Sequence, residues 1–131
     1  MVDDDVLAEL TEIYLEAAQK DVGTLERHIS SVLEKTDPWD TTCREMRRVV
    51  HNVKGQGSSF GYPLMTEIGE SLSHLLKAIE QPHEPQIKLV EAHVTALRFV
   101  MDQDIKGPGD EECRTLVKRL QELVRKLTPD Q

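Results

Sequence analysis

The sequence predicts an all-α fold, an antiparallel four-helix bundle with additional N-terminal and C-terminal helices. Apolar residues recur at intervals of three and four along most of the chain, which is the period of an amphipathic helix. Aromatic content is only 4 %, while Leu, Glu and Lys are abundant, as in bundles packed by aliphatic side chains. With 131 residues, the chain 1–131 is expected to form a single domain with a buried core.

The N-terminal region carries two apolar stripes. Asp3 to Asp5 offer N-caps and favourable charge at a helix start. The first stripe, ending near Lys20, consists of Val6, Leu7, Leu10, Ile13, Tyr14 and Ala17. The second, ending near Lys35, consists of Val22, Leu25, Ile29, Val32 and Leu33. Because Gly23 lies near their junction, one long helix and two short helices both fit the pattern.

A central helix is predicted from Pro38 to about Ser59. Asp37 is a suitable N-cap and Pro38 suits the first helical position. Gly61 is a natural left-handed stop. The apolar face of this helix consists of Trp39, Cys43, Met46, Val49, Val50, Val53, Gly57 and Phe60.

Three further helices follow. The first opens at Tyr62-Pro63 and ends before Pro82, and the second begins near Pro85. The second helix has two apolar ridges on nearly opposite sides, so two neighbours are expected to cover it. The Gly107–Gly109 hinge leads to a last helix over about 110–127, capped by Asp110. This last helix is expected to cover the second ridge, or to pair with another copy or another protein.

Composition excludes several classes of partner. The net charge of −8 argues against nucleic acid and against an anionic membrane surface. No run approaches the ~18 apolar residues of a membrane span, and the acidic start does not resemble a signal peptide. Cys43 and Cys113 lie on apolar stripes, as buried thiols in a reduced compartment do. A soluble, cytoplasmic protein is therefore expected.

A polar cluster lies beside the apolar face of the central helix. Arg47, His51, Lys54 and Ser58 point about 110° away from that face, so His51 is expected to be exposed. Lys54 is three residues from His51, close enough for both side chains to meet one bound group. Gly55 and Gly57 each cost a helix about 1 kcal/mol relative to Ala, which suggests that something approaches the backbone closely.

These residues resemble a known family. His51, Lys54, Gly55 and Gly61 match the H-x-x-K-G-x-x-x-x-x-G pattern of histidine phosphotransfer domains. The segment Phe60-Gly61-Tyr62 is also similar to the phosphoacceptor domain of chemotaxis-type histidine kinases. Val50 and Val53 stand where the family more often has Ala and Leu or Ile, which keeps the apolar face. With its helix pattern, the resemblance extends over about residues 5–105.

The resemblance implies a carrier protein of a two-component phosphorelay rather than an enzyme. His51 would accept a phosphoryl group and Lys54 would stabilise it. Arg47, Arg48, Gly55 and Ser58 would form the docking surface. The expected partners are a response-regulator receiver domain, a histidine kinase, or both. No cofactor is expected in this chain, because the receiver would bring the Mg²⁺. No nucleotide-binding signature is present, so the chain is not expected to phosphorylate itself.

Two alternatives also fit the sequence. A helical docking or dimerisation module would use the same fold without phosphate chemistry, although the intact His51-Lys54-Gly55 set favours chemistry. A detached phosphoacceptor domain of a kinase would differ mainly in what phosphorylates His51.

The remaining histidines are weaker candidates: His28, an exposed His74, His83 in a Pro-flanked loop, and a half-buried His93. A metal site is not expected, because Pro82 interrupts the Glu80 to His83 pair.

Overall fold

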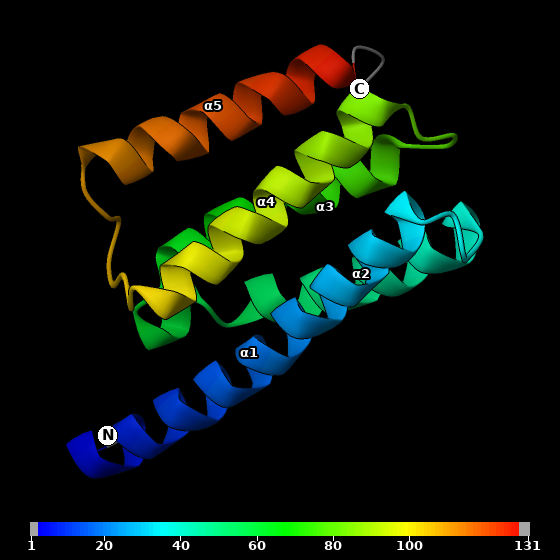
Figure 1. Cartoon of the computed structure of the whole chain (residues 1–131). Helices are drawn as coiled ribbons and strands as arrows, with labels where there is room; N and C mark the ends of the chain where they lie inside the picture. Colours follow the sequence, from blue (N-terminus) through cyan, green and yellow to red (C-terminus); the bar gives the residue numbers. More distant parts are fainter. Residues whose placement is uncertain (1–2, 129–131) are drawn as a thin grey trace.

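The computed structural model describes residues 3–128, and over this range the chain is helical without strands (Figure 1). Its elements are α1 (Asp4–Leu33), α2 (Trp39–Gly55), the short 3-10 helix η1 (Ser58–Phe60), α3 (Pro63–Ala78), α4 (Glu84–Asp102) and α5 (Glu111–Leu127). The predicted all-α class is confirmed, as are the starts of the last three helices. None of the helices in this range is long and apolar enough to cross a membrane.

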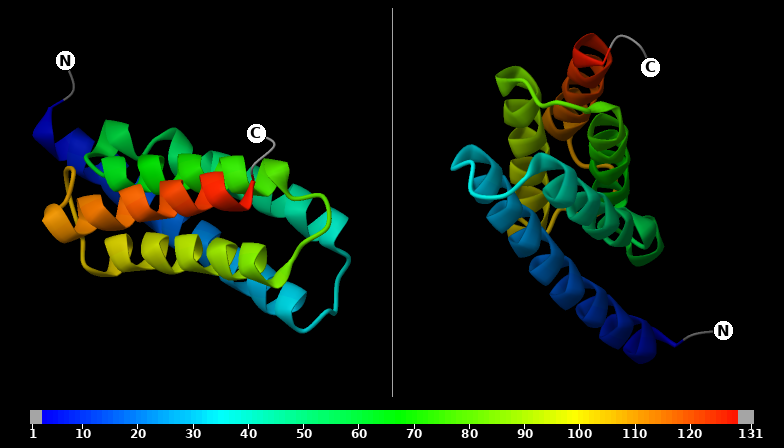
Figure 2. Two further views of the ribbon diagram at one scale, coloured as in Figure 1. Left: turned by 90° about the horizontal axis from the view of Figure 1, so that it is seen from above. Right: turned by 90° about the vertical axis from the view of Figure 1, so that its right-hand side faces the viewer.

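The first four helices form the bundle. α2 packs against α1 and α3, and α4 packs against α1 and α3 from the other side. α5 runs alongside α3 and α4, and the two views of Figure 2 show it as an additional layer over them. Leu89, Ala96 and Val100, the second ridge of α4, are buried. The C-terminal helix therefore packs on its own bundle.

Polar contacts hold α5 and its hinge in place. Asp110 caps the helix by accepting a hydrogen bond from the backbone N–H of Cys113, as predicted. Arg114 donates two hydrogen bonds, 2.6 and 2.7 Å long, to the carboxylate of Glu67 on α3. This paired geometry with a planar guanidinium fixes the position of α5 along α3.

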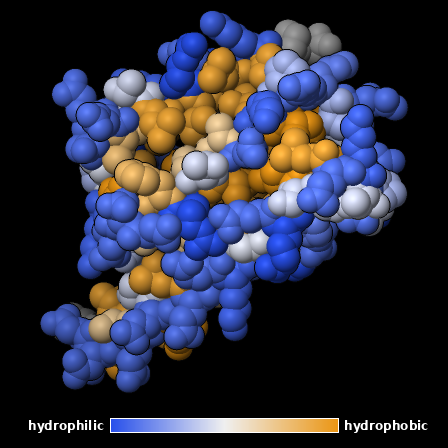
Figure 3. All heavy atoms as spheres, viewed as in Figure 1, coloured by the Kyte–Doolittle hydropathy of each residue, from blue (hydrophilic) through white to orange (hydrophobic). Residues whose placement is uncertain are grey.

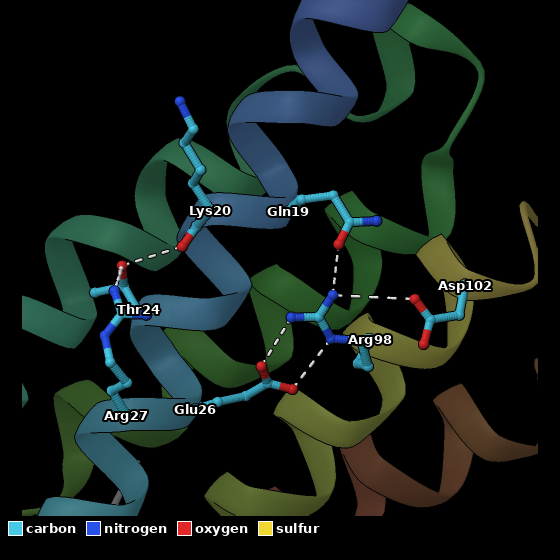
Figure 4. A network of polar contacts seen from close by, with 7 residues as sticks. All are labelled: Gln19, Lys20, Thr24, Glu26, Arg27, Arg98 and Asp102. Carbon is cyan, nitrogen blue, oxygen red and sulfur yellow. Dashed lines mark hydrogen bonds and ion pairs between the residues drawn. The ribbon is translucent and has the colours of Figure 1, made fainter.

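α1 is one continuous helix through Gly23. Val22 and Leu25, on either side of this glycine, are fully buried, and their packing offsets the helix-breaking tendency of glycine. The side chain of Arg98 on α4 also holds α1 in place through polar contacts (Figure 4). Its guanidinium donates to Glu26 at 2.8 and 3.1 Å and also to the side-chain carbonyl of Gln19. Arg98 therefore contacts α1 both before and after Gly23.

The first turns of α1 leave most of the first apolar stripe exposed. Val6, Leu7 and Leu10 are exposed, and Ile13 is 62 % exposed, whereas burial begins at Tyr14. Figures 1 and 2 show the reason: this end of α1 projects beyond the other helices, so the described residues leave its apolar side uncovered. The expected additional N-terminal helix is this projecting part of α1.

The boundaries of α2 also differ from the prediction. Pro38 occupies the N-cap position, and Asp37, the predicted N-cap, accepts a hydrogen bond from the hydroxyl of Ser31. At the other end the helix stops at Gly55 rather than near Ser59. The hydroxyl of Thr66 donates to the backbone carbonyl of Lys54 and accepts from the N–H of Ser58, both at 3.0 Å. These contacts satisfy backbone groups that a helix end leaves free.

Two glycines shape the turn after α2. A Cβ on Gly57 would lie 2.8 Å from both the backbone oxygen of Tyr62 and the hydroxyl of Thr66. Contacts within the chain itself therefore require glycine at position 57. The close approach of a partner protein is not needed to explain this residue. Gly61 has φ +89°, confirming the predicted left-handed stop before α3.

Candidate functional site

His51 lies on α2 and is exposed, as predicted. The side chains of Val49, Val50 and Val53 are nearly or fully buried, and they fix the rotation of α2 so that His51 faces outward. It opens onto a groove of about 770 Å³ between α1 and the second half of α2. The groove is lined by Leu10, Ile13, Tyr14, Ala17, Ala18, Asp21, His51, Asn52, Val53, Gly55, Gln56 and Phe60.

Tyr14 forms the base of this groove. Its ring stacks on Phe60 with 5.3 Å between centroids, and on Tyr62 at 6.3 Å. Its hydroxyl donates a hydrogen bond of 3.3 Å to the backbone carbonyl of Val53. Burial, helped by the negative charge of Asp21, raises the pKa of Tyr14 to about 12, so the phenol stays neutral and keeps its proton for this bond. α1 is thereby tied to the last turn of α2, two residues beyond His51.

Lys54 lies on the side of α2 that faces α3. Its stem packs against Gly69, where an added Cβ would come within 2.7 Å of the Lys54 Cβ. Its ammonium lies 3.0 Å from Oε2 of Glu70, and its side chain is only 18 % exposed. The hydrogen bond from Lys54 lowers the pKa of the Glu70 carboxyl, so this carboxylate is charged near neutral pH. Lys54 is thus one turn from His51, but its ammonium already has an anionic partner.

Glu70 has a second neighbour in His74. The Nε2 atom of His74 lies 3.3 Å from Oε1 of Glu70, one turn along α3. Glu70 therefore lies between two groups that can carry positive charge. Its pairing with Lys54 joins residues sixteen positions apart on different helices, so no local pattern in the sequence indicates it.

The four predicted docking residues have different settings. Arg47 and Arg48 are exposed on α2, and Arg48 forms an ion pair with Glu45 on the same helix. Gly55 is the last residue of α2 rather than a mid-helix residue, and an added Cβ would meet nothing within 4 Å. Ser58 is exposed on η1. The protein's own packing therefore does not require glycine at position 55.

The groove also brings in α1 residues that were not among the predicted site residues. Leu10 and Ile13 were placed on an apolar face of α1, and in the structure they border the groove of His51. A stripe of this kind predicts an amphipathic helix, but not whether the stripe faces the core or a free surface. That distinction depends on where the other helices end.

His93 differs from the prediction because it is fully buried rather than half buried. One ring nitrogen lies 2.8 Å from the hydroxyl of Ser71 on α3, and the other lies 2.8 Å from the backbone carbonyl of Leu89. Burial lowers its pKa to about 4, so the ring is neutral and serves the contact between α3 and α4. His74 is exposed, as expected, and His83 is exposed at the N-cap of α4. Within residues 3–128, no cluster of three potential metal ligands is present.

Comparison with protein families gives a match over nearly the whole chain. A family model described as "Hpt domain" matches residues 9–127. The matched range contains His51, the groove beside it and all five helices except the start of α1. No curated protein and no solved structure matches the chain.

Proposed function

The chain belongs to the Hpt domain family, whose members act in histidine phosphotransfer, and on this premise we propose that it carries a phosphoryl group on His51. In this proposal it exchanges that group with the aspartate of a response-regulator receiver domain. The observation that carries the proposal is the setting of His51, an exposed imidazole on a helix whose other face is locked by buried valines. Rigid presentation matters because phosphoryl transfer depends mainly on positioning and charge stabilisation.

The chemical step uses the imidazole as a nucleophile. A neutral ring nitrogen of His51 attacks the phosphorus of the aspartyl phosphate on the receiver. The new P–N bond forms as the P–O bond to the aspartate breaks, and the aspartate leaves as a carboxylate. The ring then gives up its other N–H proton to solvent. Run in reverse, the same step passes the phosphoryl group from His51 to a receiver.

Lys54 supplies charge for the phosphorylated state. A phosphoryl group on His51 carries nearly two negative charges near neutral pH, more than the single charge of Glu70. Lys54 lies one turn from His51, within the range where side chains on one helix meet. The proposed role therefore requires its ammonium to leave Glu70 and pair with the phosphoryl group.

The proposal assigns other parts of the reaction to partners. The receiver would supply the aspartate and Mg²⁺, or a histidine kinase would supply ATP and its binding domain. The present chain would act as a carrier and not as an enzyme. Arg47, Arg48, Gly55 and Ser58 would contact the receiver.

Transfer from a phosphorylated receiver tests the proposal. The wild-type chain is incubated with a receiver carrying radiolabelled phosphate, and the label is then tested in acid and in base. A phosphohistidine is labile in acid and stable in base, so this pattern is expected. Absence of label under conditions where the receiver loses its own would overturn the proposal.

A further inference from the structure

A groove between α4 and α5 carries apolar side chains that the bundle leaves exposed. It has a volume of about 480 Å³, and its lining includes Ala92, Thr95, Ala96 and Phe99 of α4 and Leu116 of α5. Phe99 is 50 % exposed and Leu116 is 41 % exposed. Figure 3 shows apolar side chains gathered over α4 and α5 on this side of the molecule. Large apolar side chains that lie together on a surface indicate an interaction site.

This surface lies away from His51. The helix that carries His51, α2, packs against α1 and α3, whereas α4 packs against the same two helices from the other side. A protein bound along α4 and α5 therefore leaves His51 and its groove accessible. An interaction at this surface requires no phosphate chemistry.

The exposed residues of α4 form one continuous stripe. Lys88, Ala92, Thr95, Phe99 and Asp102 are all exposed, and they follow one another at intervals of four and three residues. This is the seven-residue repeat with which two helices pack side by side at a crossing angle of about 20°. The small side chains in the middle of the stripe leave room for a second helix to approach closely.

The two ends of the stripe carry opposite charges. Lys88 and Asp102 each lie seven residues from Thr95, and their side chains are 58 % and 55 % exposed. Among residues 3–128, each has only a long ion-pair contact. The Lys88 ammonium lies 3.8 Å from Glu91, and the Asp102 carboxylate lies 3.9 Å from Arg98, which points toward α1 (Figure 4). Both charges are therefore available to a partner.

The stripe is complementary to itself in one orientation. When two copies lie antiparallel about a two-fold axis beside Thr95, Lys88 of each copy meets the end of the partner's stripe that carries Asp102. Phe99 of each copy then lies toward the partner's Ala92, so that a large side chain packs next to a small one. A parallel pair would instead bring lysine to lysine and aspartate to aspartate, which is unfavourable.

We propose that two copies of the chain associate through the outer face of α4 and the adjoining side of α5, with their α4 helices antiparallel. Phe99 and Leu116 supply the apolar centre of the interface. The Lys88–Asp102 pairs, which two-fold symmetry forms twice, fix the orientation of the copies. His51 remains accessible in both copies, so the dimer presents two separate grooves.

Exchange of the two charges tests their pairing. Sedimentation equilibrium of the wild type should show a dimer whose share rises with protein concentration. Asp102→Lys should weaken this dimer about tenfold or more, because it places lysines together at both ends of the interface although it makes the chain less acidic. Lys88→Asp should weaken it similarly. The double variant Lys88→Asp/Asp102→Lys should return to within about threefold of the wild type, because the pairs form again with exchanged signs.

A second pair of variants tests the apolar centre. Phe99→Asp should weaken the dimer about tenfold or more, because it puts a charge where the interface excludes water. Ile13→Asp is the matched control, since Ile13 is also an exposed apolar residue but lies on α1. This variant should dimerise like the wild type. Thermal melting checks that both variants fold.

Disulfide formation tests the orientation. Thr95→Cys should form a disulfide between two copies under mild oxidation, since the two-fold axis passes beside this position. Glu84→Cys, near the start of α4, should not, because antiparallel helices place the two copies of this residue about 30 Å apart. The wild type, whose own thiols are Cys43 and Cys113, gives the background. A disulfide in Glu84→Cys and none in Thr95→Cys would contradict the antiparallel arrangement.

Three results would overturn the dimer. The first is a monomeric wild type at concentrations up to about 1 mM, where even weak specific association is populated, which would leave the groove to a different protein. The second is a dimer that Ile13→Asp dissociates and Phe99→Asp does not, which would place the interface on α1. The third is a double charge variant as weak as the single ones. A monomer that still accepts phosphate on His51 would overturn the dimer and leave the proposed function intact.

Discussion

The ammonium of Lys54 lies 3.0 Å from the carboxylate of Glu70, so this cation, one turn beyond His51, is held by an anion on α3. Gly69 makes this arrangement possible, because a side chain there would collide with the Lys54 stem. The ion pair sets up a competition in the phosphorylated protein. The Lys54 ammonium can pair with the Glu70 carboxylate, which carries one negative charge, or with the phosphoryl group, which carries nearly two.

Lys54→Ala should slow phosphoryl transfer or shorten the phosphohistidine lifetime by about threefold to thirtyfold, since a tenfold change corresponds to about 1.4 kcal/mol. The stability of the unphosphorylated protein should fall by no more than about 1 kcal/mol, because Glu70 is half exposed and water screens the pair. Lys54→Arg should retain much of the activity because the charge remains. Time courses of transfer and of spontaneous decay measure both effects. If Lys54→Ala equals wild type in both, Lys54 has no part in the site.

Glu70→Gln should have the opposite effect to Lys54→Ala. Removing the competing charge frees Lys54 for the phosphoryl group, so the phosphohistidine should persist about two to five times longer, as expected for an ion pair worth up to about 1 kcal/mol. Glu67→Gln is the matched control, one turn earlier on α3, where the carboxylate pairs with Arg114 instead. In a Lys54→Ala background the Glu70→Gln effect should vanish. If Glu70→Gln still lengthens the phosphohistidine lifetime in the Lys54→Ala variant, Glu70 does not act through Lys54.

Gly55→Leu should leave the fold intact and block the receiver. An added Cβ at position 55 meets nothing within 4 Å, and Leu favours a helix more than Gly does. The bulk would instead project into the groove beside His51. Receiver affinity is measured by titration, and thermal melting checks the fold. Gly57→Ala is the contrasting variant, since its Cβ would collide with Tyr62 and Thr66, at a cost of about 1–3 kcal/mol. Wild-type affinity in Gly55→Leu would remove Gly55 from the docking surface.

Stability should fall as the pH drops below the ordinary histidine range, because His93 is buried in its neutral form. Its pKa is lowered from 6.5 to about 4, so the unfolded chain takes up the proton first. The stabilisation is complete above pH 6.5 and is lost as the pH falls towards 4. One such group changes the free energy of unfolding by about 1.4 kcal/mol per pH unit. The expected loss of stability between pH 6.5 and 5 is therefore about 2 kcal/mol. Urea unfolding across this interval measures it, and a flat profile would contradict the buried, neutral state.

Local signals in the sequence predicted most of the fold. Pro63, Pro85 and Asp110 mark the starts of α3, α4 and α5, because their effect on the backbone is confined to the adjoining turn. The exposure of His51 also followed from helical periodicity. The end of α2 did not, since it depends on a hydroxyl contributed by Thr66 of α3. The full burial of His93 likewise depends on Ser71, which is distant in the sequence.

The site was predictable in its nucleophile but not in its surroundings. His51 and Lys54 stand three residues apart, so the sequence alone places them on neighbouring turns. The pairing of Lys54 with Glu70 joins two helices and follows from their packing. The exposure of the first apolar stripe on α1 could not be predicted for a related reason. An apolar pattern gives the direction in which a side chain points, whereas its burial depends on the reach of the neighbouring helices.

The central claim is that His51 is the residue that carries the phosphoryl group. The most direct measurement is to phosphorylate the wild type and His51→Gln with the same receiver and to locate the phosphate by mass spectrometry at alkaline pH. His51→Gln should fold like the wild type, because an exposed helical position tolerates Gln, with a stability change of about 0.5 kcal/mol or less. The account predicts phosphate on His51 in the wild type and none in the variant. Phosphate on His28, His74, His83 or His93, or retained label in His51→Gln, would contradict it.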